Sequence, residues 1–155
     1  MKKVYVFDAD DTLWLNEWQY SAACTAFFNF LYETCGRYAP NLHAVKDSFY
    51  EIDKVNFATW GVRRGRVAET MRMCYYQVRD QILKRFGHDI FHEGHLRIIA
   101  NFGDEPFDFT RLEWLPEMRQ VLAKLKNDGH ELCLLSSYDK ATFPARIKFM
   151  KTEEF

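Results

Sequence analysis

The stretch that most constrains how this chain can fold is residues 3–14, Lys-Val-Tyr-Val-Phe-Asp-Ala-Asp-Asp-Thr-Leu-Trp. Its apolar run, residues 4–7, is β-branched and aromatic, which is typical of a short strand buried on both faces of a parallel sheet. Three acids follow this run within four positions: Asp8, Asp10 and Asp11. Because open α/β sheets bind ligands beyond the carboxyl ends of their strands, the pattern predicts a ligand site here.

The spacing of two of these acids indicates the chemistry. Only one residue separates Asp8 from Asp10, so a turn of the backbone after the strand lets both side chains converge on one small volume. Two carboxylates that close raise each other's pKa unless a cation lies between them. Mg²⁺ prefers oxygen ligands and would neutralise a phosphate as well. One carboxylate can then act as a nucleophile at phosphorus, and the other as a general acid and base.

Residues 8–13, Asp-Ala-Asp-Asp-Thr-Leu, resemble the first motif of the haloacid dehalogenase-like (HAD) hydrolases, DxDx(T/V), which also follows an apolar strand. The resemblance implies that Asp8 forms an aspartyl-phosphate and binds Mg²⁺. It implies that Asp10 is the general acid and base and offers its backbone carbonyl to the metal. Because dehalogenating members lack the second carboxylate, Asp10 favours phosphoryl transfer. Without the resemblance, a strand end with acidic turn residues is the alternative interpretation.

Composition narrows the class of protein. The chain has 155 residues, 48% of them hydrophobic, which is enough for one domain with a core. No apolar run reaches the length of a membrane span, and no signal peptide precedes the first strand, so we expect a cytoplasmic protein without a membrane partner. A formal net charge of -1 does not favour nucleic-acid binding. We expect reduced, mostly buried thiols at Cys24, Cys35, Cys74 and Cys133.

A long helical block follows the motif. Periodicity and end signals predict four helices, at about residues 16–36, 41–58, 66–86 and 90–102. Such a block is too long for a simple crossover between strands, so we predict a separate helical cap at residues 15–103 and a core made of residues 1–14 and 104–155. The resemblance supports this arrangement, because many HAD members insert a cap between the first and second motifs. That cap closes over the site and selects the leaving group.

Two polar groups within the block are candidate sites. Residues 60–66, Trp-Gly-Val-Arg-Arg-Gly-Arg, join two predicted helices, and Arg63, Arg64 and Arg66 are candidate contacts to a phosphate or carboxylate of the substrate. A solvated basic turn is the alternative. His88, His92 and His95 lie along one side of the fourth helix, where surface histidines are favoured over a metal site.

The last part of the chain returns to the predicted core. A helix from Pro116 to about residue 128 is expected to bury four residues, Met118, Val121, Leu122 and Leu125. A second short buried strand, residues 131–135, follows it, and a final helix covers about residues 142–151. Strand, helix and strand in this order predict a parallel sheet. The predicted fold class is α/β, a Rossmann-like parallel HAD core with an inserted α-helical cap.

Ser136 follows the second predicted strand, where the second HAD motif has Ser or Thr. The resemblance implies that its hydroxyl and the next backbone amide, that of Ser137, hold a phosphoryl oxygen. Thr12 would also orient the site. The lysine of the third motif and the acidic pair of the fourth are not found, and the nearby Lys140 and Lys148 lack the expected sequence context. We therefore expect a core that is part of a longer parent chain. The alternatives are a sheet edge that another molecule covers, through self-association for example, and a degenerate member of the family.

These patterns together predict a Mg²⁺-dependent phosphomonoester hydrolase that acts on a small phosphorylated metabolite through an aspartyl-phosphate. Sugar phosphates, nucleotides and phosphoglycolate all stay open as substrates. The alternative is a catalytically impaired or non-enzymatic protein of the HAD fold, which binds phosphate or uses its aromatic cap as a partner surface.

Overall fold

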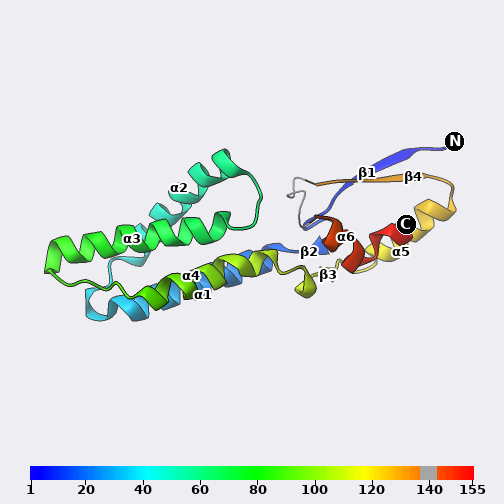
Figure 1. Cartoon of the computed structure of the whole chain (residues 1–155). Helices are drawn as coiled ribbons and strands as arrows, with labels where there is room; N and C mark the ends of the chain where they lie inside the picture. The colour runs from blue at the N-terminus through cyan, green and yellow to red at the C-terminus, as the bar shows by residue number, and fades with distance from the viewer. Residues whose placement is uncertain (137–142) are drawn as a thin grey trace. The chain divides into compact units, whose positions relative to one another are not determined.

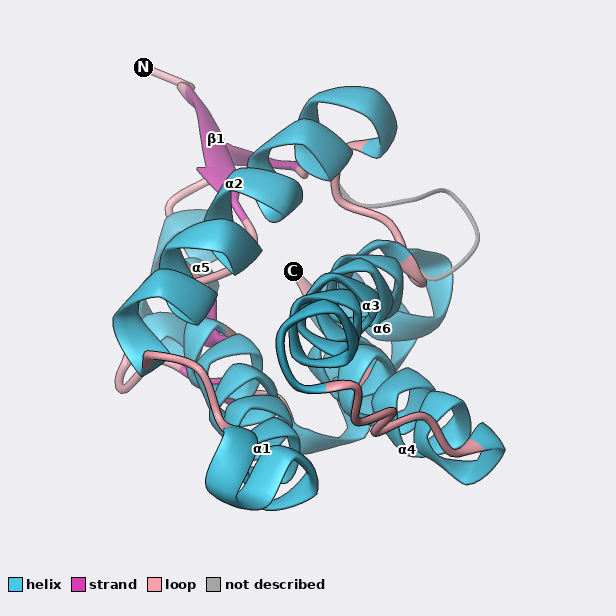
Figure 2. Cartoon of the chain, turned by 90° about the vertical axis from the view of Figure 1, so that its left-hand side faces the viewer, coloured by secondary structure: helices cyan, strands magenta, loops and turns pink. Residues whose placement is uncertain are grey.

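The computed structural model of the chain describes residues 1–136 and 143–155, and Figure 1 shows the order of its elements. Its strands are β1 (Val4–Asp8), β2 (Trp14–Leu15), β3 (Glu113–Trp114) and β4 (Glu131–Leu135). Its α-helices are α1 (Glu17–Cys35), α2 (Leu42–Trp60), α3 (Arg66–Phe86), α4 (Glu93–Asp104), α5 (Met118–Asn127) and α6 (Phe143–Met150). Most of the chain is therefore helical, as Figure 2 shows.

The chain divides into two compact units. We call Met1–Gln19 with Asp108–Phe155 the strand unit, and Tyr20–Phe107 the helical unit. The assignment of the helical block as a cap domain stays a prediction.

Strands β1 and β4 of the strand unit pair in parallel, as predicted from the order of strand, helix and strand. Their register runs from Val4 opposite Glu131 to Asp8 opposite Leu135, and the two strands lie side by side in Figure 1. A second pair, β2 with β3, is antiparallel and was not predicted, because two-residue strands leave no periodic pattern in a sequence.

The prediction that β1 and β4 are buried on both faces is wrong. Side chains alternate between half-buried and exposed along both strands, and Val6 and Leu135 are 62% and 68% exposed. The half-buried positions, Phe7 and Leu134 among them, pack on one side against the hydrophobic cluster of the strand unit. In the described ranges nothing covers the other face, so β-branched residues there remain in contact with solvent.

The core of the strand unit is built around Trp14, which is 0% exposed and meets Trp114 edge to face. The fully packed residues of this cluster are Ala9, Leu13, Trp14, Leu112, Leu122 and Met150. Helix α5 contributes Leu122, but Val121 is 44% exposed, so its predicted inward orientation is wrong. Successive residues of a helix do not share a face, and Leu122 occupies the inward one.

The predicted helices of the helical unit form close to their expected bounds. The expected range of α3 is the observed one, and Gly87 ends it with a φ of 66°. Asn41 caps α2, because its side-chain oxygen accepts from the amides of His43 and Ala44 at 3.0 and 3.3 Å. Helix α4 begins at Glu93 rather than near residue 90, because the side chain of His92 caps it.

Aromatic packing joins the four helices of this unit. Phe27 of α1 meets Phe49 of α2 with ring centroids 5.9 Å apart, and Phe30 of α1 meets Phe102 of α4 at the same separation. The Tyr75 hydroxyl of α3 donates to the backbone oxygen of Ile90 at 3.1 Å. Each helix therefore buries an apolar face against the others, which is the main source of helix stability in proteins.

All four cysteines are free. Burial raises the pKa of the Cys24 and Cys35 thiols to about 11 and that of Cys74 to about 12, whereas Cys133 is exposed on β4. Across the described ranges, no helix combines the length and the apolar character needed to cross a membrane.

Replacing Gly103 by Ala should destabilise the protein. A Cβ atom at this position of α4 would fall 2.2 Å from the Cα atom of Ala68 in α3. Alanine favours a helix by about 1 kcal/mol over glycine, but overpacking against backbone costs about 1–3 kcal/mol. The net effect on the free energy of unfolding should therefore be a decrease. Urea unfolding followed by circular dichroism measures the difference. Asn101→Ala, an exposed change in the same helix, should leave stability equal or slightly higher, and a Gly103→Ala chain as stable as this control would contradict the packing.

Candidate functional site

The carboxyl ends of β1 and β4 lie side by side in the strand unit. Asp8 is the last residue of β1 and pairs with Leu135, the last residue of β4, which Ser136 follows directly. Parallel strands expose ligand-binding groups at this end of a sheet. The structure therefore brings the predicted first and second motifs to one edge.

Residues 9–14 after β1 form a tight turn that is closed by its own backbone, and we call them the acidic turn. The Leu13 amide donates to the Ala9 carbonyl at 2.8 Å, and the Asp11 amide donates to the Trp14 carbonyl at 2.7 Å. Asp11 has a φ of 55°, in the left-handed region that aspartate tolerates better than most residues. The turn holds Asp10 close to the end of β1.

The third acid has a structural role. The carboxylate of Asp11 accepts from the backbone amides of Asn16 and Glu17 at 2.9 and 3.0 Å. These amides begin α1, so Asp11 satisfies donors that lack a partner inside the helix and places a negative charge at its positive end. Asp11 of the acidic turn therefore caps the start of α1.

Asp10 is held by two donors on one oxygen. Its Oδ1 accepts from the indole nitrogen of Trp14 at 2.7 Å and from Nη1 of Arg146 at 2.5 Å. Arg146 is 1% exposed, and its Nη2 donates to the side-chain oxygen of Asn16 at 3.3 Å. The carboxyl group of Asp10 is thus oriented by α6 and by the acidic turn together.

The environment of Asp10 alters its proton affinity. Burial raises the pKa of this carboxyl, and the charge of Arg146 and the hydrogen bond from Trp14 offset only part of that increase. The neighbouring charges of Asp11 and Asp8 raise the pKa further. A carboxyl that keeps its proton to higher pH than an ordinary aspartate is suited to general acid and base catalysis.

Sequence reasoning missed Arg146. Its signal was present, since Arg146 lies in the predicted final helix three residues after Phe143 and four before Met150, on the inward apolar face. A charged residue on such a face needs a buried partner of opposite charge. The cations considered from the sequence were Lys148, which is exposed, and Lys140, which lies outside the described residues.

The other predicted residues of the strand unit are placed as follows. Asp8 is exposed, and Thr12 and Ser136 are half-buried. Ser137 lies outside the described residues. The structure thus gathers Asp8, Asp10 and Ser136 in the same part of the strand unit, and their roles stay predictions.

The three candidate arginines belong to the helical unit. The Arg63 guanidinium stacks over the Trp60 ring at 4.5 Å, and Arg64 pairs with Asp104 at 3.3 Å on the surface. Arg66 is 7% exposed and forms an ion pair with Asp53, so it supports the helical unit and is not available to a substrate. Arg63 and Arg64 remain predicted substrate contacts.

The described residues do not provide a complete Mg²⁺ site. Mg²⁺ requires near-octahedral oxygen coordination, whereas the described ranges contain no group of three or more acidic, histidine or cysteine side chains able to hold a metal ion. Asp8 offers an exposed carboxylate, but Oδ1 of Asp10 already accepts hydrogen bonds from Trp14 and Arg146.

Among the three histidines of the predicted surface group, His95 is half-buried, and its Nδ1 lies 3.0 Å from the Tyr75 hydroxyl.

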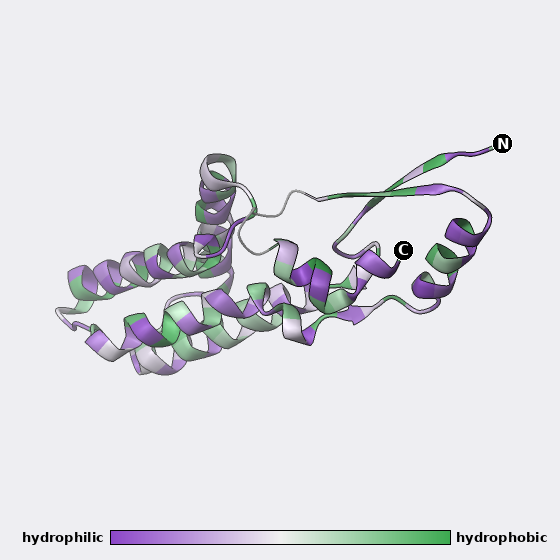
Figure 3. Cartoon of the chain, turned by 45° about the vertical axis from the view of Figure 1, so that its right-hand side comes forward, coloured by the Kyte–Doolittle hydropathy of each residue, from purple (hydrophilic) through white to green (hydrophobic). Residues whose placement is uncertain are grey.

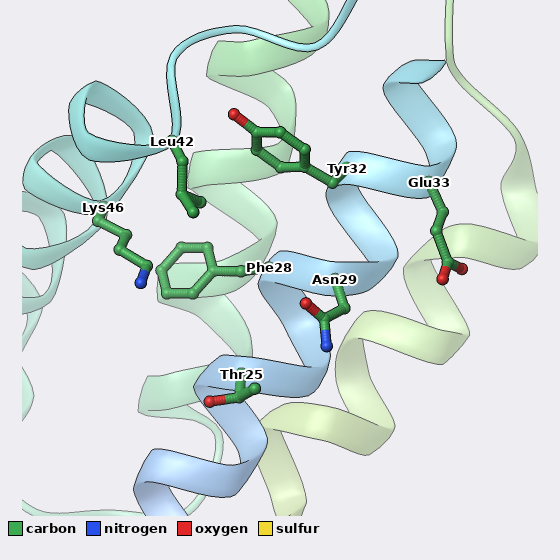
Figure 4. A pocket seen from close by; sticks show the side chains of 7 residues that line it. All are labelled: Thr25, Phe28, Asn29, Tyr32, Glu33, Leu42 and Lys46. Atoms are coloured by element: carbon green, nitrogen blue, oxygen red, sulfur yellow. The ribbon is translucent and has the colours of Figure 1, made fainter.

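A cavity of about 300 Å³ lies in the helical unit between α1 and α2 (Figure 4). Lys46 lies over the Phe28 ring at 5.5 Å, and the side chain of Asn29 lies next to Phe28, whereas Glu33 is further from this pair. The residues that line it are Thr25, Phe28, Asn29, Tyr32, Glu33, Leu42 and Lys46. None of these residues belongs to the acidic turn, so the cavity lies in a different part of the chain from the predicted catalytic residues.

No protein-family model matches the sequence, and the search of curated proteins gave no match. Among solved structures, the chain is similar to a haloacid dehalogenase-like family hydrolase from Xanthomonas campestris, with 18% sequence identity and a TM-score of 0.63. The match covers 99% of this chain and 59% of that one. A predicted phosphoglycolate phosphatase from Haemophilus somnus matches over 96% of this chain and 56% of its own, with 13% identity and a TM-score of 0.41.

Arg146→Ala should destabilise the protein most near neutral pH. Removing Arg146 should cost about 1–3 kcal/mol, because the half-buried carboxylate of Asp10 loses its charged partner. The pKa of Asp10 is raised in the folded state, so its contribution to stability is largest at acidic pH and is lost as pH rises through that pKa. Arg146 lowers the pKa of Asp10. In a chain without Arg146, more of the free energy of unfolding should therefore be lost as the pH rises.

Urea unfolding of both chains near about pH 4 and about pH 7 measures this difference. The variant should approach the parent chain at the lower pH. Lys148→Ala, an exposed change in the same helix, is the control and should have little effect at either pH. An Arg146→Ala effect that is equal at both pH values would contradict the contact with ionised Asp10.

Proposed function

Because the chain has the fold of the haloacid dehalogenase-like hydrolases, we propose that it is a phosphomonoester hydrolase that works through an aspartyl-phosphate. One observation carries the proposal. Asp8 ends β1 beside the end of β4 and Ser136, and two residues later a half-buried Asp10 is held by the buried Arg146. A nucleophile, a proton carrier and a hydroxyl donor therefore belong to one part of the strand unit.

In the first step, a carboxylate oxygen of Asp8 attacks the phosphorus atom of the ester. The bond between phosphorus and the leaving oxygen breaks, and protonated Asp10 gives its proton to that oxygen. The products are an alcohol and an acyl phosphate on Asp8. The raised pKa of Asp10 favours the protonated form that this step needs.

In the second step, water attacks the phosphorus atom of the aspartyl-phosphate. Asp10, now ionised, accepts a proton from that water, and the bond between phosphorus and the Asp8 oxygen breaks. Inorganic phosphate leaves, and both carboxyl groups return to their starting states. Arg146 positions Asp10 through Oδ1 in both steps, so the other oxygen of the carboxyl group carries the proton.

Contacts to the phosphoryl group are proposed for Thr12, Ser136 and Ser137. Ser136 is half-buried at the end of β4, where a hydroxyl and a backbone amide can donate to developing negative charge. Arg63 and Arg64 of the helical unit are proposed to contact the remainder of a small phosphorylated substrate.

Mg²⁺ stays the predicted cofactor, since it would offset the charges of the Asp8 carboxylate and the phosphoryl group. The incomplete donor set predicts weak binding. No partner of nucleic-acid or membrane type is proposed, and a cytoplasmic location stays a prediction.

A second candidate is a phosphate-binding or interaction protein without catalysis. It is favoured because the described residues include no group of three or more side chains able to hold a metal ion, and because an ion pair already engages Asp10. The chain spans 59% of the Xanthomonas hydrolase that it matches, so the activity of that whole protein is carried over here only as a proposal.

Asp8→Asn should abolish hydrolysis of p-nitrophenyl phosphate in the presence of Mg²⁺. The amide cannot form the acyl phosphate, so kcat/KM should fall at least about a thousandfold. Release of p-nitrophenol measures the rate, and chelation of the metal tests its contribution. Asp11→Asn is the matched control: its amide oxygen can still cap α1, and activity should stay within about threefold. Hydrolysis that survives Asp8→Asn would exclude the covalent route, and a parent chain that binds phosphate without turnover would favour the second candidate.

The double variant Arg63→Gln/Arg64→Gln should weaken substrate binding more than turnover. Losing charge-assisted contacts to a phosphorylated metabolite should raise KM by about tenfold, with kcat within about twofold. Steady-state kinetics on a sugar phosphate and on phosphoglycolate measures both constants. Arg97→Gln, an exposed change in α4, is the control for lost positive charge. Equal KM values for the double variant and this control would remove the arginines from the substrate site.

A further inference from the structure

Another cavity of the helical unit, of about 280 Å³, lies between the turn that joins α1 to α2 and the carboxyl end of α3. Figure 1 shows these two segments at the same end of the unit. The turn includes the 3₁₀ helix η1 (Gly36–Tyr38). All the described lining residues belong to the helical unit, so this unit forms the cavity by itself. They include Arg37, Tyr38 and Pro40 from the turn, and Ile82, Arg85 and Phe86 from α3.

Two arginines of the lining are held by aromatic rings. The Arg37 guanidinium lies over the Tyr38 ring at 4.8 Å, and its Nη2 donates to the Tyr38 hydroxyl at 2.6 Å. The Arg85 guanidinium lies over the Phe86 ring at 5.0 Å. The rings of Tyr38 and Phe86 are themselves in contact, with centroids 5.1 Å apart. This packing brings two guanidinium groups from distant parts of the sequence to one cavity and restricts their orientation.

No acid of the cavity balances these two positive charges. None of the described lining residues is acidic, and within the described ranges neither Arg37 nor Arg85 forms an ion pair. The acid nearest to Arg37 in the sequence, Glu33, lines the cavity between α1 and α2 instead (Figure 4). Like charges at one site repel each other, so a bound anion would lower the electrostatic energy of this cavity.

The acids nearest to Arg85 in the sequence are engaged elsewhere. Asp80 and Asp89 both pair with Arg79, at 3.9 and 2.7 Å. Asp89 also accepts from the backbone amide of Phe91 at 2.9 Å. The end of α3 therefore keeps an excess of positive charge toward the cavity.

The shape and the walls of the cavity indicate which anion fits. Guanidinium groups bind the oxygens of phosphate and carboxylate groups through paired hydrogen bonds. Pro40 and the buried Ile82 add apolar wall, and hydrophilic and hydrophobic residues are mixed along the helices of this unit (Figure 3). Pockets for small molecules begin at about 300 Å³, which is more than one inorganic phosphate fills. A ligand with an apolar body next to its anionic group therefore fits best.

We propose that this cavity binds a small molecule that carries a phosphate group and an apolar body. Arg37 and Arg85 hold the phosphate oxygens, and Pro40 and Ile82 contact the apolar body. The site uses no residue of the strand unit, so it is separate from the proposed hydrolysis, and its test requires no turnover.

Helix ends offer a different role for the same arginines. Basic residues near the carboxyl end of a helix interact favourably with its dipole, and Arg85 lies in the last turn of α3. Lys84 shares that turn and that role, but it is not a lining residue of the cavity. Lys84 is therefore the matched control, because only a ligand distinguishes it from Arg85.

Isothermal titration calorimetry of the 155-residue chain with phenylphosphonate tests the proposal. This probe joins a phosphonate to an aromatic ring through a carbon–phosphorus bond, which the proposed ester hydrolysis cannot break. Its dissociation constant should be below about 1 mM and should rise with salt. Arg37→Gln and Arg85→Gln should each raise that constant by about tenfold or more, because each removes a charge-assisted contact. Lys84→Gln should change it by less than about twofold.

Two further comparisons identify the site and the ligand. Ser136→Ala changes a proposed phosphoryl contact of the strand unit and should leave the affinity for phenylphosphonate within about twofold. Inorganic phosphate should bind about tenfold more weakly than phenylphosphonate, because it has no apolar body to bury. Equal affinity for the two anions would exclude the apolar contact.

Nuclear magnetic resonance provides a measurement that needs no variant. Phenylphosphonate should shift the backbone amide signals of Tyr38 and Phe86, which line the cavity. Shifts confined to the strand unit, together with binding that Ser136→Ala weakens and the arginine variants do not, would overturn this proposal and leave the proposed hydrolysis in place.

Two other results would also overturn it. One is a parent chain that does not bind phenylphosphonate at about 1 mM. The other is an equal affinity in the Lys84→Gln, Arg37→Gln and Arg85→Gln chains, with circular dichroism showing that all three are folded. That result would leave the arginines with their helix ends alone.

Discussion

The strand unit depends on the contact between Asp10 and Arg146, which joins the turn after the first strand to the last helix of the chain. Removing two charges from water is costly, and the attraction between them compensates only when the geometry is good and other hydrogen bonds are made. Here Trp14 and Asn16 supply those bonds. The same contact orients the carboxyl group that the proposed reaction needs, so stability and chemistry depend on one partly buried ion pair.

Strand β1 matters to the proposed reaction through its carboxyl end. That end presents Asp8 next to Ser136, because parallel pairing with β4 places both strand ends at one edge.

Much of the helical unit could be predicted from local signals. Asn41 and Gly87 mark helix ends through hydrogen bonding and a positive φ, and those effects involve only neighbouring residues. Burial was less predictable. A β-branched run such as residues 4–7 forms a strand whether one or both of its faces are covered, and only the contacts of distant segments decide which. Val121 was misplaced for a related reason, since an apolar residue at the border of a helix face can turn to either side.

The sequence by itself determined the acidic turn, the helices, the parallel strand pair and the resemblance to the HAD hydrolases, because each follows from residues near one another or from the order of elements. Tertiary structure alone decided that Asp11 caps a helix while Asp10 is half-buried and pairs with Arg146. The sequence does not distinguish the roles of acids at neighbouring positions. Their contacts do, since Arg146, the partner of Asp10, lies 136 residues further along the chain and reaches Asp10 only after the strand unit has packed.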